Sequence, residues 1–163
     1  MKNKIIIVGL NSEFNRILAK GLADETQGYY LDIEDYINYS LFDKAQMQQK
    51  CGLEYMKKQE KNAIASCVDY ENSVLYFPFE YFIFENNYKA FQSSSIMFYI
   101  KFSEQTLINK NKTFKDNDKI DLPLICFKEN DEQLTQICDY TINVGKKSEK
   151  TIIKEIINKI IGV

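Results

Sequence analysis

The chain has 163 residues and a mass of 19.1 kDa, so we expect residues 1–163 to form a single domain with its own core. Hydrophobic residues make up 45% of the chain and the formal net charge is −2, which indicates a folded protein without the basic face that nucleic-acid binding normally needs. The chain contains no histidine, which excludes histidine-based acid–base catalysis and histidine-activated nucleophiles.

The arginine and cysteine contents restrict the possible functions further. Arg16 is the only arginine among 21 basic residues, although arginine is the preferred clamp for phosphate oxygens. Cys67 and Cys138 lie in apolar runs and are predicted to be core residues, and the cysteine spacing favours neither a disulfide nor a metal site. No apolar run approaches the roughly 18 residues of a membrane helix, so we expect a cytoplasmic protein without membrane contacts.

Five short runs of apolar residues are predicted to be strands. Continuous apolarity is typical of strands that are buried on both faces of a parallel sheet. Helical patterns separate these runs, so we expect an α/β fold of three layers with a five-stranded parallel sheet. The predicted strands are residues 5–9, 28–32, 73–77, 95–102 and 140–145.

Three helices are predicted from apolar residues at helical spacing. A polar stretch at 109–121 is predicted to be a mobile loop, whereas 121–127 fits a lid remnant, a helix or an extra strand equally well. The predicted apolar helix faces are Phe14, Ile17, Leu18 and Leu22, then Leu53, Met56, Ala63, Ile64, Cys67 and Val68, and finally Ile152, Ile153, Ile156, Ile157, Ile160 and Ile161.

The first predicted strand meets a helical pattern within three residues, in GLNSEFNR (9–16). A working phosphate-binding loop has the form GxxxxGK[ST], whose glycines and lysine hold the phosphates. With a gap, Asn11 takes the lysine position and Ser12 takes the hydroxyl position as helix N-cap. Gly9, Asn11 and Ser12 are therefore the candidate remnant of a nucleotide site, and a plain helix cap explains Ser12 as well.

Along almost its full length the chain resembles shikimate kinases, small P-loop kinases of the nucleoside monophosphate kinase type. NSEFNRILAKGLA (11–23) is similar to the family's helix after the loop, and YYLDIEDYI (29–37) to its strand ending in Asp-x-Asp. GLEYMKKQE (52–60) resembles the family's GExxFRxxE motif. SIMFYIKFSEQTL (95–107) and CDYTINV (138–144) resemble the fourth strand with its helix and the last strand.

The resemblance implies roles for three residues. Asp32 would be catalytic by organising magnesium, and Glu34 and Lys57 would contact the substrate, with Lys57 in place of an arginine. Other interpretations remain open. Asp32 and Glu34 also fit an acidic cap on a helix starting near Ile33. Lys57 fits a solvated helix face, and Glu60 fits a partner for Lys57 or Lys61.

The departures from the family pattern concern catalysis. Phe77-Pro78-Phe79 stands where the family has a Gly-Gly-Gly turn, and neither the loop lysine nor a lid arginine is present. Loss of one transition-state cation can cost about 10³–10⁵ in rate. We therefore expect a degenerate member without phosphoryl transfer or cofactor, which acts as a binding or regulatory module. The alternative is a weak Mg-ATP-dependent kinase in which Lys20 or Lys57 replaces the missing lysine.

Residues 76–91 contain eight phenylalanines and tyrosines. These rings either fill the space of a lost substrate pocket or form an exposed apolar patch for a protein partner. A small-molecule ligand for the chain is compatible with both interpretations. Base stacking on a nucleic acid is disfavoured by the acidic charge balance.

Overall fold

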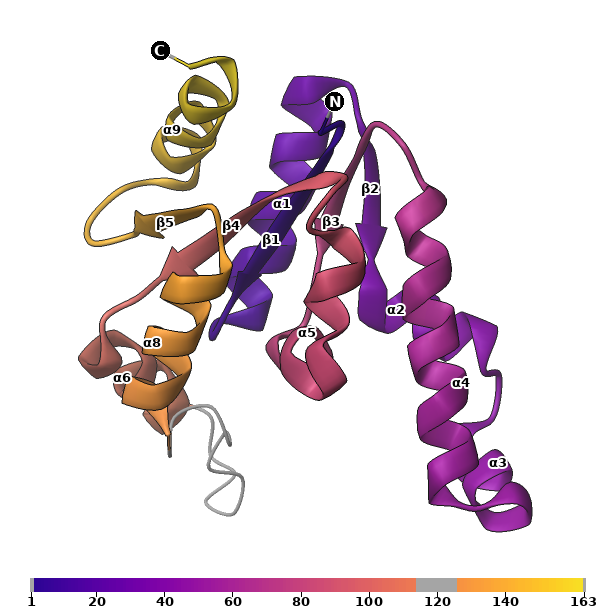
Figure 1. Cartoon of the computed structure of the whole chain (residues 1–163). Helices are drawn as coiled ribbons and strands as arrows, with labels where there is room; N and C mark the ends of the chain where they lie inside the picture. Colours follow the sequence, from indigo (N-terminus) through magenta and orange to yellow (C-terminus); the bar gives the residue numbers. More distant parts are fainter. Residues whose placement is uncertain (1, 114–125, 163) are drawn as a thin grey trace.

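The computed structural model describes residues 2–113 and 126–162. In this part of the chain, five strands form one parallel sheet in the order β2-β3-β1-β4-β5 (Figure 1). The predicted three-layer α/β fold with a five-stranded parallel sheet is confirmed, and each predicted strand coincides with an observed one. The strands are β1 (Lys4–Gly9), β2 (Tyr29–Asp32), β3 (Ser73–Tyr76), β4 (Ser95–Lys101) and β5 (Tyr140–Asn143).

The centre of the sheet is buried on both faces. In the β1 register, Ile6 is paired with Leu75 of β3 on one side and with Met97 of β4 on the other. All three side chains are at most 1% exposed. An uninterrupted apolar run is stable in such a position because both of its faces are covered by helices.

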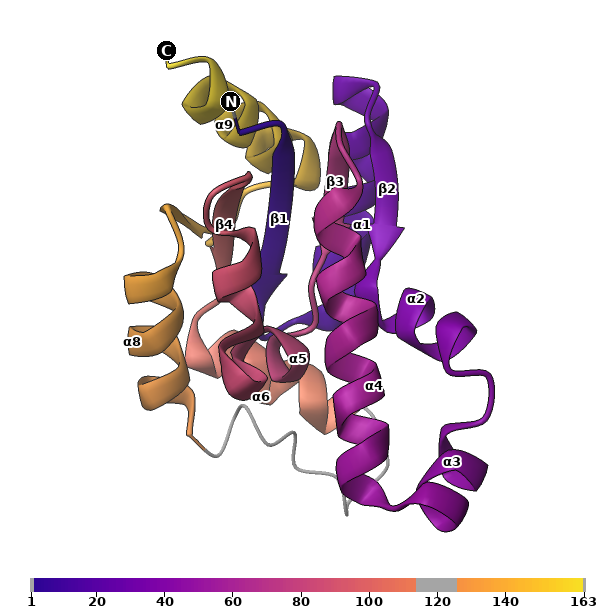
Figure 2. The same ribbon diagram turned by 45° about the vertical axis from the view of Figure 1, so that its right-hand side comes forward.

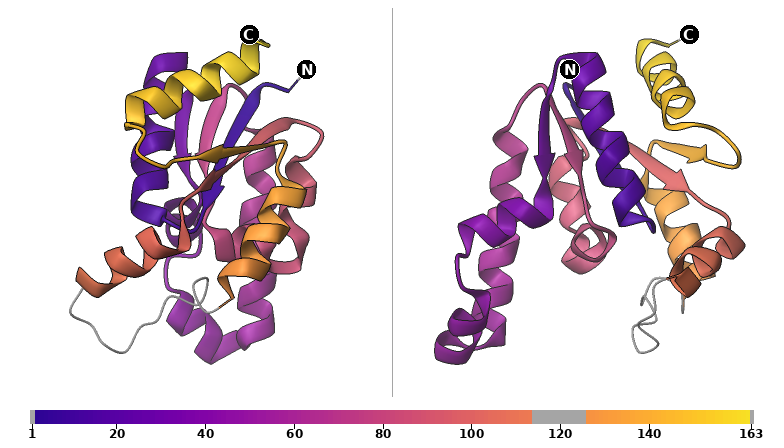
Figure 3. Two further views of the ribbon diagram at one scale, coloured as in Figure 1. Left: turned by 90° about the vertical axis from the view of Figure 1, so that its left-hand side faces the viewer. Right: turned by 180° about the vertical axis from the view of Figure 1, so that it is seen from behind.

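Helices cover the two faces of the sheet and extend one of its edges. The left view of Figure 3 shows α1 and α9 on one face and α4, α5 and α8 on the other. Figure 2 shows α3 and the first turns of α4 projecting beyond the carboxyl ends of the strands. The helices are α1 (Ser12–Thr26), α2 (Ile33–Ser40), α3 (Lys44–Cys51), α4 (Leu53–Ser66), α5 (Phe79–Ile83), α6 (Glu104–Thr113), α8 (Phe127–Ile137) and α9 (Glu149–Ile161), with the 3₁₀ helices η1 (Cys67–Asp69) and η2 (Phe84–Phe91).

The predicted helix faces are confirmed except at Ile17, at Leu53 and at Ile161, which ends α9 and is 64% exposed. Leu18 and Leu22 of α1 are fully buried, but Ile17 is 51% exposed. The prediction for Ile17 is wrong because the buried residues of α1, among them Asn15 and Ala19, gather on one side of the helix, and Ile17 lies on nearly the opposite side. Leu53 is exposed for a different reason: it begins α4 in the part that projects beyond the sheet.

The aromatic residues of segment 76–91 are mainly core residues. The rings of Phe77, Phe82 and Phe91 are fully buried. Phe77 packs edge to face against Phe82 at 5.2 Å and against Phe91 at 5.4 Å between ring centroids. Phe84 is 38% exposed. These three rings are therefore core residues, and the use of the segment by a protein partner stays a prediction.

The polar stretch after β4 begins as a helix. Helix α6 continues to Thr113, so residues 109–113 are not the predicted loop. The rest of that prediction, and residues 121–125 of the undecided segment, lie outside the described residues. Phe127, the last residue of the undecided segment, begins α8. Among the described residues, no helix combines the length and apolar character that crossing a membrane requires.

Candidate functional site

The candidate site lies at the carboxyl edge of the sheet, where β1 passes almost directly into α1. Strand β1 ends at Gly9 and α1 begins at Ser12. The Asn11 side-chain oxygen caps the helix by accepting a hydrogen bond from the Phe14 N–H at 3.2 Å. The prediction that Ser12 is the N-cap is therefore wrong, because Ser12 is already the first helical residue and the preceding Asn11 has the cap position.

Gly9 is required by packing at this turn. A Cβ atom at Gly9 would lie 2.6 Å from the Ile100 carbonyl oxygen and 2.9 Å from the Asn15 Nδ2 atom. Asn15 is fully buried in the first turn of α1, and its amide has no hydrogen-bond partner among the described residues. The close approach of β4 and Asn15 accounts for Gly9 without a ligand.

Arg16, Asp32 and Glu34 form a cluster on one side of the turn, which we call the arginine cluster. The Arg16 Nε donates to the Asp32 Oδ2 at 2.7 Å, and its Nη2 donates to the Glu34 Oε2. Asp32 is buried and also caps α2, since its Oδ1 accepts from the N–H groups of Glu34 at 2.9 Å and Asp35 at 3.2 Å. The predicted acidic helix cap is thus confirmed for Asp32, and its carboxylate is shared with Arg16.

The charges of the arginine cluster influence the pKa values of Tyr30 and Tyr76. The Arg16 guanidinium carbon lies 4.9 Å from the centroid of the Tyr76 ring. Burial, followed by the charge of Asp32, raises the pKa of Tyr30 to about 12. Burial also raises the pKa of Tyr76; Arg16 acts to lower it, and Asp32 and Glu34 act to raise it. Both hydroxyls therefore stay protonated at neutral pH.

Lys44, Lys57 and Glu60 form a second cluster, which we call the lysine cluster. The buried Glu60 carboxylate is 3.3 Å from the Lys57 Nζ and 3.7 Å from the Lys44 Nζ. The Tyr81 hydroxyl donates to Glu60 at 3.3 Å and accepts from Lys44 at 3.3 Å. Of the two predicted partners of Glu60, Lys57 is confirmed, whereas Lys61 pairs with Glu85. The contributions of Lys44 from α3 and Tyr81 from α5 were not predicted.

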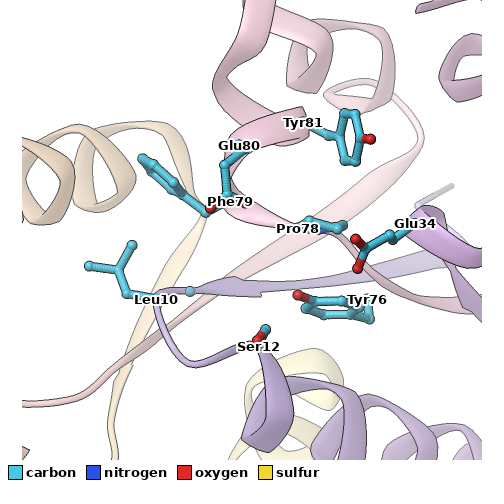
Figure 4. Close-up of a pocket in the computed structure, with 9 residues that line it drawn as sticks. Leu10, Ser12, Glu34, Tyr76, Pro78, Phe79, Glu80 and Tyr81 are labelled. Carbon is cyan, nitrogen blue, oxygen red and sulfur yellow. The ribbon is translucent and has the colours of Figure 1, made fainter. Parts of the chain in front are cut away.

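A cavity of about 310 Å³ opens between the ends of the strands and α1, α2 and α5. Of the predicted site residues, the cavity brings together Gly9, Ser12 and Glu34. Asp32 and Lys57 lie in the two clusters and do not line it. The lining residues, most of which are labelled in Figure 4, are Gly9, Leu10, Ser12, Glu34, Tyr76, Pro78, Phe79, Glu80 and Tyr81.

Phe77-Pro78-Phe79 is singled out by the sequence and contributes Pro78 and Phe79 to the lining, whereas Tyr76, Glu80 and Tyr81 are not among the predicted site residues. Tyr76 ends β3 at the carboxyl edge, which is the position where ligands meet parallel sheets. Glu80 follows Pro78 in the first turn of α5, where an acidic residue is favoured by the helix dipole. These local signals were available, but the aromatic residues around them were interpreted only as core or as a patch.

Comparison with known proteins identifies the fold. No protein-family model matches the chain, and no curated protein matches it in sequence. A shikimate kinase from Bacteroides thetaiotaomicron aligns with a TM-score of 0.75 at 13% identity, over 98% of both chains. A shikimate kinase from Acinetobacter baumannii in complex with shikimate aligns with a TM-score of 0.77 at 14% identity, over 98% of this chain and 93% of that one.

Two further solved structures also align with nearly the whole chain. A shikimate kinase from Aquifex aeolicus aligns with a TM-score of 0.75 at 16% identity, over 98% of this chain and 96% of that one. An uncharacterized protein from Eubacterium ventriosum aligns over the whole of both chains with a TM-score of 0.55 at 15% identity. The chain therefore has the fold of shikimate kinases and related P-loop kinases.

Proposed function

We propose that this protein is a small-molecule-binding or regulatory module on a shikimate kinase-like fold, without phosphoryl-transfer activity. The observation that carries the proposal is the β1–α1 turn, in which only Leu10 and Asn11 separate the strand from the helix. A phosphate-binding loop needs several residues whose N–H groups surround the phosphates and a lysine that reaches them. A two-residue connection capped by its own asparagine supplies neither.

The cations near the turn support the same proposal. Arg16 directs two of its nitrogens at Asp32 and Glu34, and Lys57 and Lys44 pair with Glu60. A nucleoside triphosphate would have to displace these carboxylates to gain a cation, and Asp32 would then keep a buried charge without its partner. The residues present are therefore a poor fit to Mg-ATP.

Lys20 is also poorly placed as a substitute for the missing lysine. It lies eight residues beyond Ser12 on α1, which corresponds to about 12 Å along the helix axis. Its side chain is exposed on the far part of that helix. The alternative function, a weak ATP-dependent phosphotransferase, therefore depends on a rearrangement of Lys57 away from Glu60.

Calorimetric titration with Mg-ATP and then with shikimate, each at millimolar concentration, tests the proposal. The Acinetobacter baumannii shikimate kinase serves as the positive control under the same conditions. We expect no heat with Mg-ATP and no transfer of phosphate to shikimate. ATP binding tighter than about 100 μM, which corresponds to roughly 5.5 kcal/mol, would contradict the proposal. Measurable transfer of phosphate from ATP would also contradict the proposal if the variant Asp32→Asn, which keeps an oxygen for the helix cap, abolished it. That result would favour the phosphotransferase.

The proposal also covers the cellular compartment of the protein and a protein partner. We propose a reducing compartment such as the cytoplasm, in which free thiols like those of Cys51, Cys67, Cys126 and Cys138 persist. A regulatory module needs a protein partner. In segment 76–91, the partly exposed side chain of Phe84 would contribute to the contact surface for that partner. Size-exclusion chromatography with light scattering at two protein concentrations tests self-association directly.

A further inference from the structure

A second cavity, of about 260 Å³, lies between α4 and η2. None of the described residues that line it also lines the cavity at the β1–α1 turn. The apolar part of its lining consists of Ile64, Ala65 and Ala90. The polar part consists of Lys61, Glu85, Asn86, Asn87 and Lys89. The second cavity therefore offers a ligand both apolar surface and charged groups.

The charges of this lining favour an anion. The Lys61 Nζ is paired with the Glu85 Oε2 at 2.8 Å, so these two charges balance each other. Lys89 is exposed and has no ion pair within the described parts of the chain. Two lysines and one glutamate thus leave the lining with a net charge of +1 while the Lys61–Glu85 pair is intact.

The ion pair itself does not close the cavity to an anion. The side chains of Lys61 and Glu85 are 49% and 52% exposed, and an ion pair in such a position contributes little to stability because water screens it. A ligand carboxylate can replace Glu85 beside Lys61, and the displaced Glu85 then enters water. At the β1–α1 turn the same exchange would leave Asp32 buried without its partner.

The wall that η2 contributes is held in a fixed conformation. Glu85 and Asn86 have φ angles of 45° and 57°, a left-handed backbone that is unfavourable for residues other than glycine. Asn87 is 6% exposed, and its Nδ2 donates to the Tyr81 carbonyl at 2.8 Å, which fixes the chain after the two strained residues. Such strain persists where surrounding contacts fix the backbone, and it is concentrated at ligand-binding sites. A preformed wall lowers the entropic cost of binding.

We propose that the second cavity is a binding site for a short aliphatic carboxylate. The anionic end of the ligand lies at Lys89 and Lys61, and its chain packs against the apolar part of the lining. This inference goes beyond the proposed function, which depends on the β1–α1 turn. At about 30 Å³ for each water-sized group, a cavity of about 260 Å³ accommodates on the order of nine non-hydrogen atoms, which is the size of hexanoate.

Three probes test this ligand class. Hexanoate and hexylammonium carry aliphatic chains with opposite charges, and acetate keeps the carboxylate without the chain. Titrations of the full chain at low ionic strength, followed by amide chemical shifts, give the dissociation constants. We expect hexanoate to bind at least about tenfold more tightly than the other two, because one lacks the charge-assisted hydrogen bond and the other lacks the apolar contact. Equal or tighter binding of hexylammonium or acetate would overturn the proposal.

Variants test whether hexanoate binds in this cavity. Lys89→Met removes the unpaired ammonium group and should weaken hexanoate binding about three- to tenfold. Ala65→Leu fills part of the apolar lining and should weaken it more than about tenfold. Both residues are exposed, so neither change disturbs the core. Lys154→Met makes the same charge change as Lys89→Met on α9, which covers the other face of the sheet (Figure 3), and should leave the affinity unchanged. Unchanged affinity in Lys89→Met or in Ala65→Leu would contradict binding in this cavity.

The result is separable from that of the proposed function. ATP turnover together with hexanoate binding would refute the non-catalytic proposal and keep the carboxylate site. Absence of hexanoate binding at about 20 mM would overturn the carboxylate site alone, because the argument from the β1–α1 turn does not use the second cavity.

Discussion

The arginine cluster and the lysine cluster lie beside the same cavity, and the ratio of cations to carboxylates in one is the reverse of that in the other. In the arginine cluster one cation, Arg16, is shared by two carboxylates, of which Asp32 is buried. In the lysine cluster one buried carboxylate, Glu60, is shared by two lysines whose side chains are 30% and 40% exposed. The shared ion is therefore a cation on one side and an anion on the other.

The two clusters connect different elements of the fold. The arginine cluster connects α1 to the β2–α2 junction within the body of the sheet. The lysine cluster connects the projecting α3 to α4, and through Tyr81 to α5. Both clusters pair charges internally, and Glu34 of the arginine cluster and Tyr81 beside the lysine cluster also line the cavity between them.

Loss of the shared cation should have the largest effect on stability. Arg16→Met keeps an apolar stem but leaves Asp32 and Glu34 close together, with Asp32 buried. Breaking a fully buried pair costs about 3–5 kcal/mol, and partial exposure of Arg16 reduces the expected loss to about 2–3 kcal/mol. Urea unfolding at pH 7 measures it. Lys20→Met on the exposed side of α1 is the matched control and should change stability by less than about 0.5 kcal/mol. A loss no larger than that of the control would show that the arginine cluster does not hold α1 to α2.

Loss of the shared anion should have a smaller effect. Glu60→Gln keeps the shape of the side chain and an acceptor for Tyr81, and the two lysines can turn towards solvent. We expect a loss of about 1–2 kcal/mol, since no buried charge is left unpaired. The same urea experiment compares this variant with Glu54→Gln in the first, exposed turn of α4. A larger loss for Glu60→Gln than for Arg16→Met would reverse the order of the two clusters.

The fold was predictable because its signals are local and repeated. The three inner strands are mainly apolar runs, and the spacing of Ile152 and Ile156 identifies the helix that packs on the sheet. Errors occurred where burial depends on position in the whole molecule, as for Ile17 and for Leu53 in the projecting start of α4.

The candidate site was less predictable. Asp32 and Glu34 were indicated by the resemblance to shikimate kinases, since Asp32 ends a strand and Glu34 comes two residues later. Of the two expected partners of Glu60, Lys57 lies at helical spacing from it. The contact of Lys44 with Glu60 and Tyr81 joins three separate helices, and no sequence interval indicates it. The make-up of the cavity wall is likewise a property of the tertiary fold, because Glu34 and Glu80 line one cavity only when α2 and α5 reach the same edge of the sheet.

The smallest expected effect is a pH dependence that distinguishes the two clusters. The Tyr30 hydroxyl donates to Asp32 at 3.4 Å, and burial together with that carboxylate raises the pKa of Tyr30 to about 12. In the unfolded chain tyrosine titrates near about 10, so the folded state binds more protons between these values. The contribution of Tyr30 to stability is therefore fully present below about pH 10 and is lost as the pH rises towards 12.

Tyr30→Phe removes this contribution, so the stability difference between the wild type and the variant should shrink from pH 9 to pH 11 in urea titrations. Tyr81 of the lysine cluster provides the comparison. Burial raises its pKa too, but the hydrogen bond from Lys44 acts in the opposite direction, so Tyr81→Phe should show a smaller change. Equal slopes for the two variants would mean that Asp32 and Lys44 do not impose different fields on their tyrosines, and the contrast between the clusters would then be limited to their ion pairs.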